Sequence, residues 1–188
     1  MADRHYTRHV QQRKSEGKVM RHWALSAAIG AAILISSSAS PAQGLVSGSY
    51  ILDEERSDDV SQAIQSAVVG LSNRPFAQRL RKSAGATPGY AIRISIAAGR
   101  FSINNDAKPL IRVWTNGEPI KWKLEDGQVF DVSAKANGDA ISLTLRGADS
   151  ERTIVYRSDG QQLVAETIIT SPLLSTPIRY KVVYNRAR

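Results

Sequence analysis

Hydrophobic and polar residues alternate along much of the chain after residue 90. In the most regular segments every second residue is apolar, and the residues between them are mainly Lys, Arg, Asp, Ser or Thr. These segments are 92–96, 120–124, 130–135 and 141–145. A period of two puts the apolar side chains on one face of a β-strand. Looser alternation at 153–157, 162–169 and 178–184 predicts strands with two buried faces or a polar interior.

Turn signals separate these segments at regular intervals. Four pairs combine Asn or Asp with Gly: Asn116-Gly117, Asp126-Gly127, Asn137-Gly138 and Asp159-Gly160. Such pairs accept the positive φ angles of tight hairpin turns. Residues 146–149 supply a further turn in the longest interval. The chain is therefore expected to reverse about every ten residues, which is typical of an antiparallel barrel or sandwich.

A different pattern precedes the strands. Residues 48–53 predict a first strand, after which Ser57 is expected to cap a helix with Asp58 and Asp59 in its first turn. Apolar residues then recur at helical spacing: Val60, Ile64, Ala67, Val68 and Leu71. Asn73 is expected to cap a second helix that stops at Gly85. The predicted order is one strand, a helix pair and about nine further strands.

The first 42 residues have the features of a leader. Residues 1–22 carry six cations against two acids, and residues 23–35 are uncharged. This uncharged run is shorter than the roughly 20 apolar residues that span a bilayer. Ser40-Pro41-Ala42 then matches a small-x-small cleavage pattern. We predict a Sec-type signal peptide at 1–42, a single domain at 43–188, and a periplasmic or secreted protein; an uncleaved N-terminal anchor is the alternative.

Composition narrows the chemistry that the remaining chain can perform. The 188 residues have a formal net charge of +8 and no cysteine, and all three histidines lie within the first 22 residues. Without His or Cys, thiolate nucleophiles and the usual zinc sites are excluded from residues 43–188. Half of the net charge also lies in the leader, which argues against a nucleic-acid partner. We expect no nucleic-acid binding, no cofactor and no metal.

One cluster of carboxylates needs a separate interpretation. Five acids lie within seven residues before the first predicted helix: Asp53, Glu54, Glu55, Asp58 and Asp59. They could form an acid–base pair or a cation site, but their spacing is not that of an EF-hand loop. A solvated helix start, favoured by the helix dipole, is the simpler interpretation. We therefore predict that the protein is not an enzyme, with carboxylate chemistry as the weakest alternative.

The order of elements resembles the fatty-acid-binding-protein branch of the lipocalin-like barrels. The resemblance covers about residues 44–188 by layout, with local similarity at 48–52, 153–164 and 182–186. It implies an all-β, mainly antiparallel, up-and-down barrel of about ten strands, with a two-helix lid after the first strand. In that family the barrel encloses a cavity that holds water and apolar ligands, and the helix pair covers its mouth.

The resemblance breaks at the family's carboxylate clamp. That clamp pairs an arginine with a tyrosine two positions later on the last strand, and here Val182 stands two positions before Tyr184. Arg179 and Tyr180 are adjacent, so they point to opposite faces of a strand. Either Arg152 or Arg157 could bind an anionic head group, but strand parity leaves open which of the two faces inward. A bound fatty acid therefore does not follow from the resemblance.

Aromatic residues on the inward parity are the candidate ligand contacts. The residues that we predict to line a ligand cavity are Trp122, Phe130, Tyr156, Tyr180 and Tyr184. The alternative is that these rings fill a barrel that holds no ligand, because side chains alone nearly fill barrels of this size.

The second predicted helix carries a basic surface and no acidic residue. Its cations are Arg74, Arg79, Arg81 and Lys82. They could contact an anionic membrane surface transiently, or they could simply solvate an exposed face.

Together these patterns predict an exported protein that binds or carries a small apolar or amphipathic molecule, such as a lipid, without covalent chemistry. A ligand-free structural or interaction protein of the cell envelope is the alternative.

Overall fold

The computed structural model describes residues 44–85, 88–106 and 108–188. The expected leader at residues 1–42 and its cleavage site lie outside these residues and stay predictions. Among the described residues, no helix has the length and apolar character needed to cross a bilayer.

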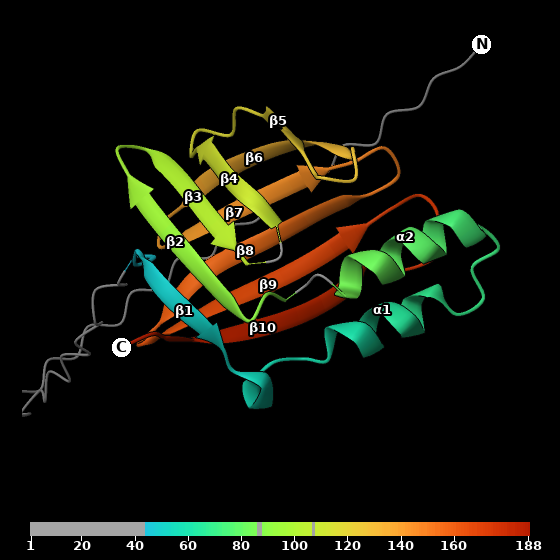
Figure 1. Cartoon of the computed structure of the whole chain (residues 1–188), viewed down its shortest axis with the longest axis horizontal. Coiled ribbons are helices and arrows are strands. Elements are labelled where there is room, and N and C mark those ends of the chain that lie inside the picture. The colour runs from blue at the N-terminus through green and yellow to red at the C-terminus, as the bar shows by residue number, and fades with distance from the viewer. Residues whose placement is uncertain (1–43, 86–87, 107) are drawn as a thin grey trace, which may run out of the picture. The chain divides into compact units, whose positions relative to one another are not determined.

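Ten antiparallel strands form one sheet that curves into a nearly closed barrel (Figure 1). The strands are β1 (Gly48–Leu52), β2 (Ala91–Ala97), β3 (Arg100–Asn105), β4 (Lys108–Trp114), β5 (Ile120–Lys123), β6 (Val129–Asn137), β7 (Ala140–Arg146), β8 (Glu151–Asp159), β9 (Gln162–Thr170) and β10 (Ile178–Arg186). Most strands pair with their neighbours in sequence, and β1 pairs with both β2 and β10. The predicted fold class is confirmed.

The sheet order ends at β4 and β5, and these two strands form the seam of the barrel. Just beyond β4, the chain bypasses β5 and pairs with β6. The Gly117 amide donates to the Ala134 carbonyl over 2.8 Å, and the Ala136 amide donates to the Thr115 carbonyl over 3.1 Å. These bonds close one end of the seam. Toward the start of β4, no ladder to β5 is found within the described part of the chain.

The predicted tight turns are present. Gly117, Gly127, Gly138 and Gly160 all have positive φ, as the Asn-Gly and Asp-Gly pairs require. The turn between β2 and β3 was not predicted, because there Ala98 takes the first position with φ 48° before Gly99.

Two helices follow β1 and lie side by side at one end of the strands (Figure 1). They are α1 (Val60–Val68) and α2 (Arg74–Gly85), preceded by the short 3-10 helix η1 (Glu54–Arg56). Asn73 caps α2 as predicted, its side chain accepting from the Phe76 amide over 3.0 Å. The predicted cap of α1 is wrong: Asp59 caps it, because the Ser57 hydroxyl accepts a bond from the Val183 amide of β10 instead.

The barrel has two different ends. We call the end with α2 and the β3–β4, β5–β6, β7–β8 and β9–β10 turns the mouth, and the opposite end the floor. At the floor, residues 44–47 are tied to two distant turns. The Leu45 amide donates to the Asp139 carbonyl over 3.1 Å, and the Val46 amide donates to the Ser158 hydroxyl over 3.2 Å. The chain therefore enters the barrel at the floor.

The half of the barrel nearer the floor is packed. Phe101 is fully buried, and its ring lies 5.7 Å from that of Tyr156 across the interior. Ile94, Val113, Leu143 and other inward residues of the alternating strands are also buried. Space for a ligand is therefore found at the mouth.

Candidate ligand cavity

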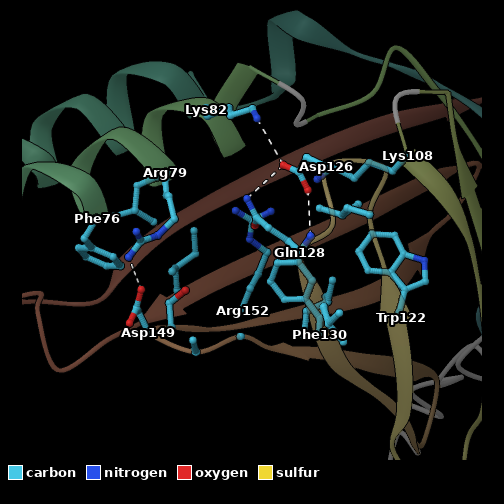
Figure 2. A pocket seen from close by; sticks show the side chains of 18 residues that line it. Phe76, Arg79, Lys82, Lys108, Trp122, Asp126, Gln128, Phe130, Asp149 and Arg152 are labelled. Atoms are coloured by element: carbon cyan, nitrogen blue, oxygen red, sulfur yellow. Dashed lines mark hydrogen bonds and ion pairs between the residues drawn. The ribbon is translucent and has the colours of Figure 1, made fainter.

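A cavity of about 500 Å³ lies between α2 and the rim of the mouth (Figure 2). Phe76 and Leu80 of α2 cover it. The barrel side is formed by the β5–β6 and β7–β8 turns and by residues near the mouth ends of the strands, which include Leu124, Phe130, Leu145 and Ile169. Cavities of roughly 300–1,000 Å³ are typical of small-molecule sites. The volume and the apolar side chains suit the greasy part of a small ligand.

A second, smaller hollow of about 70 Å³ lies deeper in the barrel. Tyr156, Tyr180 and Tyr184 line it together with aliphatic side chains. Four residues line both hollows: Lys108, Trp122, Leu145 and Arg152. These shared residues mark the junction between the space under α2 and the packed interior.

Two buried polar atoms of residues that line the smaller hollow have no hydrogen-bond partner among the described residues. They are Nε1 of Trp122, whose residue is 7% exposed, and the hydroxyl of Tyr180, whose residue is 4% exposed. Buried polar atoms are nearly always paired in native proteins, and exceptions need an explanation. Both groups are hydrogen-bond donors.

Arg152 reaches the cavity through regular strand geometry. On β8 it has the parity of Tyr156, and it lies between Leu145 of β7 and Ile169 of β9. Arg157 has the opposite parity, and its guanidinium pairs with Glu166 on the outer surface. The sequence left open which of the two arginines faces the barrel interior. The strand register shows that it is Arg152.

Lys108 reaches the cavity because the pairing of β3 with β4 is irregular at the start of β4. Ile111 and Val113 point inward on β4, so strict alternation would point Lys108 outward. The β3–β4 register shifts between Ile103 and Asn105, and Lys108 pairs with Asn105 instead. A β-bulge of this kind re-aims a side chain, and Pro109, which lacks an amide proton, fits such a break in the ladder.

The interior chemistry reflects these two cations. Burial lowers the pKa of Lys108 to about 8, and the positive charge of Arg152 contributes to the shift. Burial raises the pKa of Tyr156 and of Tyr184, so both phenols stay neutral at physiological pH. The interior therefore contains positive charge and neutral hydroxyl groups.

Two ion pairs connect α2 to the rim of the mouth, and we call them the lid pairs (Figure 2). Arg79 pairs with Asp149 of the β7–β8 turn. Nζ of Lys82 lies 3.3 Å from Oδ2 of Asp126 in the β5–β6 turn. The Gln128 amide, followed by Lys82, lowers the pKa of Asp126 against the opposing effect of desolvation. This carboxylate therefore stays charged to lower pH than an ordinary aspartate.

The structure brings the predicted ligand contacts together around the two hollows. Trp122 and Phe130 line the larger cavity, with ring centroids 6.0 Å apart. Trp122 also lines the smaller hollow with Tyr156, Tyr180 and Tyr184. Their role in binding stays a prediction. Lys108 is not among the residues predicted from the sequence, although Pro109 within an alternating strand is a signal for a bulge.

The predicted basic surface of α2 is divided. Arg79 and Lys82 form the lid pairs, and Nε of Arg81 donates to the Gln65 side chain of α1 over 3.3 Å. Arg74 is exposed at the start of the helix. Contact of these four residues with a membrane stays a prediction.

Three carboxylates of the cluster before α1 accept hydrogen bonds from backbone amides. Asp53 accepts from the Arg56 amide and from the Asn185 side chain, Asp58 accepts from the Lys181 amide, and Asp59 caps α1. Within residues 44–85, 88–106 and 108–188, no group of three side chains suited to a metal ion is found.

Comparisons with known proteins give a likeness in structure. No protein-family model matches the chain, and no curated protein sequence matches it. Human cRBP IV superposes with a TM-score of 0.51 and 17% identity over 76% of this chain and 98% of that one. A fatty acid binding protein of Schistosoma mansoni, solved with arachidonic acid, gives 0.50 and 17% over 75% and 95%.

A heat-soluble (SAHS) protein of Ramazzottius varieornatus gives a TM-score of 0.53 with 10% identity over 75% of this chain and 94% of that one. At these identities the likeness concerns the fold. The chain has the fold of the lipocalin-like barrels, in the ten-stranded, helix-covered form of the fatty-acid-binding proteins.

Proposed function

We propose that this protein binds a small apolar or amphipathic molecule, such as a lipid, without covalent chemistry. The observation that carries the proposal is the cavity of about 500 Å³, lined by apolar side chains and covered by Phe76 and Leu80 of α2. Structural neighbours that bind fatty acids support it. They are binding proteins, which supports a carrier over an enzyme.

Tryptophan fluorescence tests the proposal directly. Trp122 lines the cavity, and Trp114 is 41% exposed on the outer face of β4. Titration of the purified protein with decanol is expected to shift the emission of the wild type and of Trp114→Phe, but not of Trp122→Phe. Calorimetry of the same three proteins measures the affinity independently of the fluorophore. Absence of binding in both measurements would favour the ligand-free alternative.

We also propose export by a Sec-type signal peptide, supported by the charge pattern of residues 1–22 and the small-x-small residues before Gln43. The expected location is the periplasm or the exterior. Mass spectrometry of the exported protein is expected to give an N-terminus at Gln43. Retention of residues 1–42 in the exported form would instead support the anchor.

Transient contact of α2 with an anionic surface is a further part of the proposal. Its support is the absence of acids from Arg74–Gly85 together with four cations. Co-sedimentation with vesicles rich in anionic lipid is expected to fall when Arg74, Arg81 and Lys82 are changed to Gln. Vesicles of neutral lipid are the control, and equal sedimentation of variant and wild type with anionic vesicles would end this part of the proposal.

A further inference from the structure

The two inward cations come from strands that are distant in the sheet. Lys108 begins β4, on one side of the seam, and Arg152 lies on β8, three strands beyond the other side. Both line the larger cavity and the smaller hollow. Figure 2 shows both side chains beside the cavity that Trp122 and Phe130 also line.

Two cations in such a place are unfavourable by themselves. Both residues are partly buried, and the strand neighbours of Arg152 on either side are the aliphatic Leu145 and Ile169. Burial disfavours the charged form of a group, and a nearby like charge adds to the penalty. Both side chains have partners within the protein. A negative charge placed between them would still lower the electrostatic free energy.

Neutral donors complete the same region. Nε1 of Trp122 and the hydroxyl of Tyr180 are buried, and neither has a partner among the described residues. A carboxylate or phosphate accepts several hydrogen bonds at once. The two cations at the junction therefore suit an anionic group better than a neutral one, and Tyr180 beside the smaller hollow adds an unpaired donor.

We propose that Lys108 and Arg152 form a subsite for the anionic head group of an amphipathic ligand whose apolar tail lies in the cavity under α2. This inference rests on the proposed function and specifies its ligand class. The subsite differs from the lid pairs, in which Arg79 and Lys82 already face Asp149 and Asp126 at the rim. It also uses neither Val182 nor Tyr184 of the last strand as a clamp.

Probes that share one tail and differ in the head group test the subsite. Decanoate, decyl phosphate and decanol are titrated by calorimetry into the wild type, Lys108→Met and Arg152→Met. The matched control is Lys121→Met, whose ammonium pairs with Asp131 on the outer surface over 2.7 Å. Circular dichroism and thermal melting establish that each variant is folded.

The wild type is expected to bind at least one anionic probe about tenfold or more tightly than decanol. Lys108→Met and Arg152→Met are expected to lose most of that preference, and Lys121→Met is expected to keep it. A difference between decanoate and decyl phosphate identifies the preferred head group. Equal affinities for anionic probes and decanol in the wild type would overturn the subsite and leave the proposed function standing. If no probe binds, both fail.

The pH dependence gives a second readout that does not require a variant at Arg152. The pKa of Lys108 is about 8, so its charge is lost as the pH rises through that value, while the probe carboxylate stays ionised. Decanoate affinity of the wild type is expected to fall across this range, and that of Lys108→Met to change little.

Other charged or titratable groups line the two hollows with Lys108. They are Arg152, Tyr156, Tyr180 and Tyr184 in the barrel, Asp126 and Asp149 at the rim, and Arg79 and Lys82 on α2. If the decanoate affinity of Lys108→Met fell with rising pH as much as that of the wild type, one of these other groups would be the one that titrates. That result would contradict the role of Lys108.

Discussion

At the scale of single residues, Phe101 shows how much of the stability lies in the packed half of the barrel. Its side chain is fully buried against Tyr156, whereas Trp114 lies on the outer face with the Arg100 guanidinium 4.1 Å from its ring centroid. Phe101→Ala is expected to lower the free energy of unfolding by about 3–5 kcal/mol, because it leaves a cavity. Trp114→Ala is expected to cost about 1 kcal/mol. Urea denaturation measures both, and equal losses would contradict the packed floor.

Lys108 should affect stability in a pH-dependent way. Its pKa in the folded protein is about 8, against 10.5 for an unperturbed lysine. The unfolded chain therefore binds more protons between these values, and stability from this group rises with pH across that window. Replacing Lys108 by Met removes the penalty of a buried charge, which is fully present below pH 8.

Lys108→Met is accordingly expected to be more stable than the wild type by about 3 kcal/mol at pH 7, with the difference fading toward pH 10.5. Urea denaturation at pH 7 and pH 10 measures the change, with Lys121→Met as the exposed control. A difference that stays constant with pH would show that the charge of Lys108 is not responsible.

For most strands the sequence pattern was sufficient to predict which side chains point into the barrel. It was not sufficient for Lys108. Trp122 and Tyr184 follow the alternation of their strands, so their positions could be read directly from the sequence. Lys108 depends on a register shift that involves the partner strand β3. The residues of β4 alone do not reveal this shift in register. Pro109 does indicate where the regular pairing of β4 is interrupted.

At the scale of elements, the lid pairs define how α2 is held. The pairs Arg79–Asp149 and Lys82–Asp126 join the helix to two different turns. Changing Asp126 and Asp149 together to Asn is expected to increase amide hydrogen exchange in α2 severalfold and to change the melting temperature little, because exposed ion pairs contribute little to stability.

The matched control for this double change is Asp131→Asn, which breaks an exposed ion pair between β5 and β6 that does not involve α2. It is expected to leave exchange in α2 unchanged. If the double variant exchanges at the wild-type rate in α2, the packing of Phe76 and Leu80 alone holds the helix in place.

The helix boundaries show what local sequence determines. Asn73 was predicted to cap α2 because a cap bond is made within a few residues. Ser57 was predicted to cap α1 for the same reason, but its hydroxyl accepts from β10, which lies far away in sequence. The Ser57 hydroxyl is thus engaged by a strand near the other end of the chain, and Asp59 caps α1 instead.

At the scale of the whole molecule, the turn spacing was sufficient to predict the number and order of strands, but not the location of the cavity. Whether ten strands enclose space depends on how side chains from all of them fill the interior together. Here Phe101 and Tyr156 fill the half near the floor, and the cavity lies under α2 instead.

Closure of the floor can be tested at Tyr50. Its hydroxyl donates to the Val46 carbonyl over 2.6 Å, and burial raises its pKa, so the bond persists in mild alkali. Tyr50→Phe is expected to lower the free energy of unfolding by about 1 kcal/mol and to speed exchange of the Leu45 and Val46 amides. Tyr90→Phe, at an exposed tyrosine, is the control. Unchanged exchange would mean that the bonds to Asp139 and Ser158 alone fix the segment.

Entry of the chain at the floor also separates the start of the described domain from the cavity. The nine-residue strands β8, β9 and β10 are each about 30 Å long and run between the floor and the mouth. A fluorescent dye attached at residue 44 would therefore lie at the end of the barrel opposite to the helix-covered opening.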